Sequence, residues 1–285
     1  MRSGRCKVLE RSEQPDAPQP ADSADGTRPV KFRGAGFTPK LDRNAGWLAL
    51  AAVIAVWQLA SSMGWVNPLF LPAPTAILRA IWQLAVSGEL WLHLGYSVMR
   101  IGIGWLLGTV AGVIAGFAIG LSSRARGVGM TFISALFPIP KIALLPLLIL
   151  WLGIGEEPKI ATIALGVFFS TAISVYSGVD AVPRNLIRMA QSFNVPFHTI
   201  VWKVIWPGAL PSILAGFRIT ASIALLLVVS AEMIGAQFGI GAFVLQAGNL
   251  MQTDQLLAGV VILSLFGLAV GKLINVLEAR LLHWR

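Results

Sequence analysis

Lys141, Arg218 and Glu232 lie inside long apolar stretches of this sequence, where they could carry chemistry. Lys141 stands among apolar residues and prolines in "FPIPKIALLPLL", whereas Arg218 and Glu232 share one apolar stretch. Charges at membrane depth are costly and usually face a charged partner or a watery cavity. Two interpretations follow for Lys141, Arg218 and Glu232: a role in a transport pathway or gate, or a structural charge paired between helices.

The usual marks of an enzyme are missing from the sequence. His93, His198 and His283 fall in different connections, and the single cysteine, Cys6, offers no metal site. No Gly-rich loop followed by Lys and Ser or Thr is present to cradle phosphates. We therefore predict a non-enzymatic chain that binds no metal, cofactor or ATP itself. A membrane-embedded enzyme is the alternative, although its clustered histidines or acidic residues are not found.

The elements that position these residues are expected to be membrane-spanning helices. The chain has 285 residues, of which 56% are hydrophobic and 12% charged, with a mean hydropathy of +0.75. Soluble domains carry about 25% charged residues, and about 20 apolar residues cross a bilayer as a helix. We predict an all-α polytopic membrane protein, a six-helix bundle over residues 46–285. The expected spans are 47–63, 101–121, 129–152, 160–179, 209–236 and 256–276.

Three local patterns refine this bundle. Glycines recur every fourth residue from Gly104 to Gly120, which predicts close packing against a neighbouring helix. Three prolines in the third span, at 138, 140 and 146, predict a kinked or locally open helix. Residues 74–93 predict an amphipathic helix with Leu78 and Trp82 on its apolar face, either at the membrane surface or packed against the bundle.

The basic residues indicate the orientation. Sixteen lysines and arginines lie in the N-terminal tail, in residues 122–128 and 182–207, and at the C-terminus, whereas the opposite connections hold only two. By the positive-inside rule both termini face the cytoplasm of a multi-pass cell-membrane protein. This distribution explains the net charge of +9 better than nucleic-acid binding does. Residues 1–45 are polar and rich in Pro, Asp and Ser, which predicts a disordered cytoplasmic tail.

A basic, proline-containing segment, "RMAQSFNVPFHTIVWKVIWPGALP" at 188–211, interrupts the apolar sequence. It resembles the cytoplasmic EAA loop of ABC importer permeases, which runs Glu-Ala-Ala, three residues, Gly, nine residues, Ile-x-Leu-Pro. The spacing is kept, with Arg in place of the acidic residue and Asn in place of Gly. The residues of this loop that the resemblance assigns to ATPase coupling are Arg188, Met189, Ala190, Phe193, Asn194, Val204 and Pro207.

Further stretches, among them "FPIPKIALLPLLILWLGIGEEPKI" and "SAEMIGAQFGIGAFV", resemble the permeases that import sulfonates, taurine and nitrate. The resemblance implies a type I importer permease that forms the pathway for a small solute by alternating access. It also implies two cytoplasmic ATPase subunits that carry the ATP, a second permease copy and an extracytoplasmic solute-binding protein. A homodimer is expected, with a paralogous partner as the alternative. A secondary transporter without ATPase partners is the other transport class left open.

The loop can act as a mechanical link. Residues 185–193 are expected to form a short helix that ends near Asn194, with the small Ala190 docked closely in an ATPase cleft. Pro207 would fix the chain's return to the membrane. Movement of the cleft would then carry the fourth and fifth spans with it.

Overall fold

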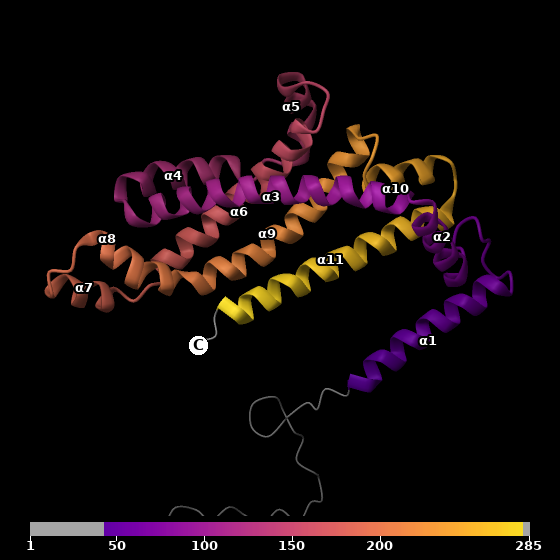
Figure 1. The fold of residues 1–285 in the computed structure, drawn as a ribbon, viewed down its shortest axis with the longest axis horizontal. Coiled ribbons are helices and arrows are strands. Elements are labelled where there is room, and N and C mark those ends of the chain that lie inside the picture. Colours follow the sequence, from indigo (N-terminus) through magenta and orange to yellow (C-terminus); the bar gives the residue numbers. More distant parts are fainter. Residues whose placement is uncertain (1–42, 282–285) are drawn as a thin grey trace, which may run out of the picture. The chain divides into compact units, whose positions relative to one another are not determined.

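The computed structural model describes residues 43–281, and every regular element in that range is a helix, as predicted (Figure 1). The predicted tail, 1–45, lies almost entirely outside the described residues. Contacts divide the chain after Ala49, and the packing described below belongs to the part from Leu50 onward. The elements are α1 (Arg43–Ser62), α2 (Pro74–Ser87), α3 (Glu89–Leu121), α4 (Ser123–Leu136), a 3-10 helix (Lys141–Leu144), α5 (Leu145–Leu152), α6 (Glu157–Asp180), α7 (Arg184–Ser192), α8 (Phe197–Ile200), a π-helix (Val201–Ile205), α9 (Trp206–Gly235), α10 (Ile240–Asn249) and α11 (Thr253–Leu281).

Four described helices are long and apolar enough to cross a membrane. They cover Glu89–Leu121, Glu157–Asp180, Phe197–Gly235 and Thr253–Arg280. The bent pair α4 and α5 makes a fifth if it counts as one span, and the apolar part of α1 is shorter. The described residues thus support four or five spans of the six predicted, and the second predicted span is the end of a longer helix, α3.

The glycine stripe of α3 packs against α6, as its spacing predicts. An added Cβ would lie 2.7 Å from Thr171 Cβ at Gly112 and 2.6 Å from Val175 Cβ at Gly116. Carbon atoms in contact normally stay about 3.5–4.0 Å apart. Only glycine therefore permits the two backbones to approach this closely, and α3 and α6 lie side by side along the stripe (Figure 1).

The amphipathic helix α2 packs against the bundle, which is one of the two predicted placements. Its buried residues Ile77, Ala80 and Leu84 form a cluster with Ala258 of α11. Leu78 and Trp82 remain exposed, so the packed face is offset from the one that the sequence pattern indicated.

The predicted third span is broken where its prolines lie. The axes of Ser123–Leu136 and Lys141–Leu152 differ by 84°. Pro140 immediately precedes the 3-10 helix, and Pro146 is near the start of α5, where a missing N–H is tolerated. The kink that the sequence predicts is confirmed.

Candidate functional site

The segment 182–207 connects α6 to α9 through three short elements. The helix expected over residues 185–193 is present as α7, and α8 follows after Pro196. The π-helix Val201–Ile205 then leads into α9, whose second residue is Pro207. Pro207 has no N–H to donate to the carbonyl of residue 203, which is a physical reason for irregular hydrogen bonding here.

One face of α7 is apolar and uncovered in this chain. Leu186, Met189 and Phe193 recur at helical spacing and are 42%, 56% and 76% exposed. Exposed contiguous apolar side chains beside polar ones are typical of a protein-binding surface. We call Leu186, Met189 and Phe193 the outer face of α7.

The face of α7 next to the outer face packs on its own bundle. Ile187 and Ala190 contact a buried cluster that includes Val175 and Val179 of α6 and Ala209 of α9. Packing of Ile187 and Ala190 sets the rotation of α7, and Ala190 stays partly exposed, so its expected contact with a partner remains a prediction. The outer face is the more exposed apolar part of α7.

Asn194 occupies a left-handed backbone position with φ of 54° just after α7. Glycine adopts this conformation most readily, and Asn is among the few other residues that do so routinely. Asn194 aligns with the Gly of the EAA loop, so the backbone turn explains why Asn can stand there. Its backbone N–H donates to the carbonyl of Gln191 at 2.9 Å, which closes the end of the helix.

Val204 and Trp206 anchor the segment to the bundle. Val204 packs against the same cluster as Ala190, together with the buried Ile205. Pro207 begins α9 next to Trp206, whose ring stacks on Phe117 of α3 with centroids 5.1 Å apart. The segment is therefore attached to α6, α9 and α3.

A second polar site lies at the other end of α3. The carboxylate of Glu232 accepts hydrogen bonds from Arg100 Nη1 at 2.7 Å, from Ser97 Oγ at 2.8 Å and from the backbone N–H of Gly241 at 2.8 Å. Arg100 also forms a two-pronged ion pair with Glu156, one arm of which, Nη2 to Oε1, measures 2.9 Å. Arg100, Glu156, Lys159 and Glu232 are called the ion cluster below.

The ion cluster is neutral, with Arg100, Lys159 and Glu232 buried and Glu156 partly exposed. Arg100 and Glu232 are each 1% exposed, and Lys159 Nζ lies 3.2 Å from Glu156 Oε1. Glu156 lies before α6, and its hydrogen bonds from Arg100, with a smaller contribution from Lys159, hold the pKa of its carboxyl below the ordinary value. Two cations thus face two carboxylates, the arrangement in which buried charges are tolerated.

The ion cluster fixes the connection from α9 to α10. The carbonyl of Phe238 accepts from Arg100 Nη1 at 2.6 Å, and the backbone N–H of Ile240 donates to Ser97 Oγ at 2.9 Å. Gly239 has φ of 132°, and a Cβ there would lie 2.5 Å from Glu232 Oε1. Glycine is therefore required for the chain to fold over the carboxylate.

The three charges singled out in the sequence are not brought together. Lys141 Nζ donates to the carbonyls of Leu136, Phe137 and Ile139 at 2.8, 2.9 and 2.7 Å, so it covers the open end of α4. Arg218 of α9 forms an ion pair with Glu278 of α11. Within residues 43–281 no hydrogen bond or ion pair joins any two of Lys141, Arg218 and Glu232, and the contacts of each agree with a structural charge.

Comparison with known proteins decides the family. Residues 108–283 match the family described as the binding-protein-dependent transport system inner membrane component. The chain belongs to this family. The permease is 35% identical to the putative aliphatic sulfonates transport permease protein SsuC of Bacillus subtilis, over 90% of this chain and 98% of that protein.

Two relatives from Escherichia coli extend the comparison. The putative aliphatic sulfonates transport permease protein SsuC is 38% identical over 85% of this chain and 92% of its own length. The taurine transport system permease protein TauC is 36% identical over 82% and 87%.

Solved structures show the same fold at lower identity. The permease matches a chain of the inward-facing MetNI methionine ABC transporter with a TM-score of 0.58 and 19% identity, over 74% of this chain and 98% of that one. An amino acid ABC transporter with histidines gives 0.56 and 16%, over 70% and 96%. These likenesses confirm the all-helical importer permease fold.

Sequence reasoning found Glu232 in this permease but missed its partners Arg100 and Glu156. Arg100 lies just ahead of the predicted second span, and Glu156 lies in a connection, so neither stood out as a membrane charge. The available signal was Glu232 itself, because a buried carboxylate requires a cation. Gly239, Ile240 and Gly241 form the turn over Glu232.

Proposed function

We propose that this permease imports small sulfonates, such as alkanesulfonates and taurine, with energy from partner ATPases. The names of the SsuC and TauC relatives support the solute class. The observation that carries the ATPase coupling is the exposed outer face of α7, which stands on a segment with EAA-loop spacing. The structural likeness to the methionine and amino acid transporters does not bear on the choice of solute, since one fold can serve different substrates.

The packing of α7 suggests how force would pass into the membrane. A cluster of buried residues joins the segment to both flanking spans: Val175 and Val179 of α6, Val182, Ile200 and Ile205 of the connection, and Ala209 and Ile213 of α9. A close-packed contact of this kind transmits displacement rather than absorbing it. ATP-driven movement of a partner docked on α7 would therefore shift α6 and α9 together, which is the motion that alternating access needs.

The proposed assembly has two copies of this permease, two cytoplasmic ATPase subunits and an extracytoplasmic solute-binding protein. Membership of a binding-protein-dependent transport family supports the last two kinds of partner. A homodimer is the simplest arrangement with two equivalent α7 docking faces, and a paralogous second permease is the alternative.

The orientation that this function needs places α7 in the cytoplasm and α10 outside. Gln191 on α7 and Gln246 on α10 are both exposed, so cysteines there report on the two sides. In a variant lacking Cys6, a membrane-impermeant thiol reagent should label Gln246→Cys in intact cells and spare Gln191→Cys. Strong labelling at position 191 with none at 246 would reverse the orientation.

Transport in proteoliposomes tests the function itself. The permease, its ATPase and its solute-binding protein should accumulate labelled taurine or an alkanesulfonate when ATP is supplied on the ATPase side. Omission of the binding protein should abolish uptake, and methionine should not be accumulated. Sulfonate uptake without ATP would indicate a secondary transporter, and ATP-driven uptake of methionine alone would contradict the solute class.

A further inference from the structure

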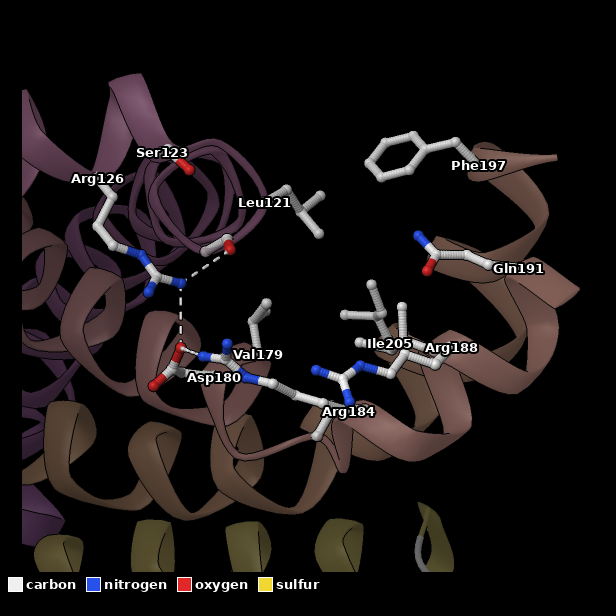
Figure 2. Close-up of a pocket in the computed structure, with 13 residues that line it drawn as sticks. Leu121, Ser123, Arg126, Val179, Asp180, Arg184, Arg188, Gln191, Phe197 and Ile205 are labelled. Atoms are coloured by element: carbon white, nitrogen blue, oxygen red, sulfur yellow. Dashed lines mark hydrogen bonds and ion pairs between the residues drawn. The ribbon is translucent and has the colours of Figure 1, made fainter. Parts of the chain in front are cut away.

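A cleft of about 400 Å³ opens beside α7, between that helix, the α3–α4 turn and the end of α6 (Figure 2). Its polar lining comes from three elements. Ser123 and Arg126 belong to α4, Asp180 ends α6, and α7 contributes a row of side chains at the cleft: Arg184, Arg188 and Gln191. Figure 2 shows Arg188 and Gln191 reaching into the open centre from one side, with Arg126 on the other.

The charges of the cleft do not balance. Asp180 Oδ1 accepts from Arg126 Nη2 at 3.0 Å and lies 3.9 Å from Arg184 Nη2, so one carboxylate serves two arginines. Arg188 forms no ion pair with an acidic side chain anywhere in residues 43–281. Three guanidinium groups therefore face one carboxylate, which leaves the cleft positive and able to attract an anion.

The position of the cleft restricts the kind of anion. It lies at the ends of α3 and α6, two helices long and apolar enough to cross a membrane, and therefore at headgroup depth. Leu121, Val179 and Phe197 add apolar walls beside the arginines. Basic pockets between membrane helices suit anionic lipid headgroups, and the planar guanidinium fork matches the oxygens of a phosphate.

We propose that this cleft binds a phosphate group, either the phosphodiester of an anionic phospholipid or a free phosphate-like oxyanion. Arg188 and Arg184 would donate to its oxygens, with Gln191 as a neutral donor. The bound group would bridge α7 to the α3–α4 turn and hold α7 against the bundle. An effect of the bound group on coupling to the ATPase rests on the proposed function. Binding of the phosphate group does not, because it needs no ATPase.

Binding to the purified full-length permease, measured by native mass spectrometry, tests the proposal. The probes are phosphatidylglycerol, phosphatidylcholine with the same acyl chains, and inorganic phosphate. Arg188→Gln removes the unpaired guanidinium, and Arg124→Gln is the matched control because Arg124 is exposed on α4 and does not line the cleft. One basic residue near an anionic headgroup contributes about 1 kcal/mol, so Arg188→Gln should weaken binding about fivefold.

The two sources of the phosphate give different results. Tighter binding of phosphatidylglycerol than of phosphatidylcholine, weakened by Arg188→Gln but not by Arg124→Gln, supports a lipid site. Binding of inorganic phosphate with the same dependence on Arg188, and no preference between the lipids, supports a free oxyanion. Equal affinities in the two variants, or no binding of either anion, would overturn the proposal. Melting temperatures of both variants in detergent check that each is folded, and Arg184→Gln repeats the test at a second donor.

Discussion

Arg100 and Glu232 lie 132 positions apart in the chain, yet their side chains meet with Nη1 and Oε1 2.7 Å apart, and each is 1% exposed. Removing one member of such a pair leaves a buried charge without its partner, which costs about 3–5 kcal/mol. We therefore expect Glu232→Ala to lower the melting temperature of the permease in detergent strongly, and Glu232→Gln less so because the amide oxygen still accepts hydrogen bonds.

Glu278→Gln is the control for this change. It breaks the ion pair with Arg218. Because the Arg218 side chain is half exposed, this ion pair contributes about 0–1 kcal/mol. If Glu232→Gln left the melting temperature unchanged but abolished transport, Glu232 would have the pathway role that its contacts do not favour.

Glu156 makes the stability of the permease depend on pH. Its pKa lies below the ordinary value of 4.5 because Arg100 and Lys159 favour the carboxylate. The folded state therefore gains stability from Glu156 above pH 4.5, and that contribution is lost as the pH falls through the lowered pKa. At neutral pH Glu156→Gln should melt below the parent protein, and the two melting temperatures should converge on acidification.

Glu157→Gln provides the matched control, since Glu157 is the exposed neighbour of Glu156. Its melting temperature should differ little from that of the parent at any pH. A gap between Glu156→Gln and the parent that stays constant, or widens, in acid would contradict the assignment.

The contact between α3 and α6 depends on the absence of a side chain at Gly112. An added Cβ would stand 2.7 Å from Thr171 Cβ, so a larger residue must push the two helices apart. Overpacking costs about 1–3 kcal/mol, and Gly112→Leu should accordingly reduce both the yield of monodisperse permease and its melting temperature. Gly102→Leu on the same helix is the control, because nothing lies within 4 Å of a Cβ there. Equal losses in both variants would show that leucine is poorly tolerated throughout α3 and that the close approach is not responsible.

The sequence predicts the helical class, the glycine-lined contact and the broken third span because each depends on local composition or spacing. The prolines near Lys141 and the glycines at every fourth residue are visible within short stretches of the sequence. The short helix expected over residues 185–193 is likewise present as α7. These features need no knowledge of distant parts of the chain.

The ion cluster and the rotation of α7 could not be predicted in the same way. Arg100, Glu156 and Glu232 come from separate parts of the sequence, and their meeting is a consequence of how α3, α6 and α9 pack. Ala190 suggested a docking contact because it is small and matches the EAA loop. Its inward position is set by the cluster that it contacts on α6 and α9, which only the tertiary structure shows.

Met189→Glu tests most directly whether a partner ATPase docks on the outer face of α7. Met189 is 56% exposed and does not belong to the buried cluster, so the substitution should leave membrane levels normal. A carboxylate at a contact that becomes buried on docking costs several kcal/mol if it is unpaired. Arg124→Glu, a charge change at an exposed position in the first turn of α4, is the control.

The measurement is solute-stimulated ATP hydrolysis by the reconstituted transporter, with co-purification of the ATPase followed in the same samples. We predict that Met189→Glu loses the stimulation and retains little ATPase, while Arg124→Glu keeps most of both. Full stimulation in Met189→Glu, or an equal loss in the two variants, would contradict coupling through the outer face of α7.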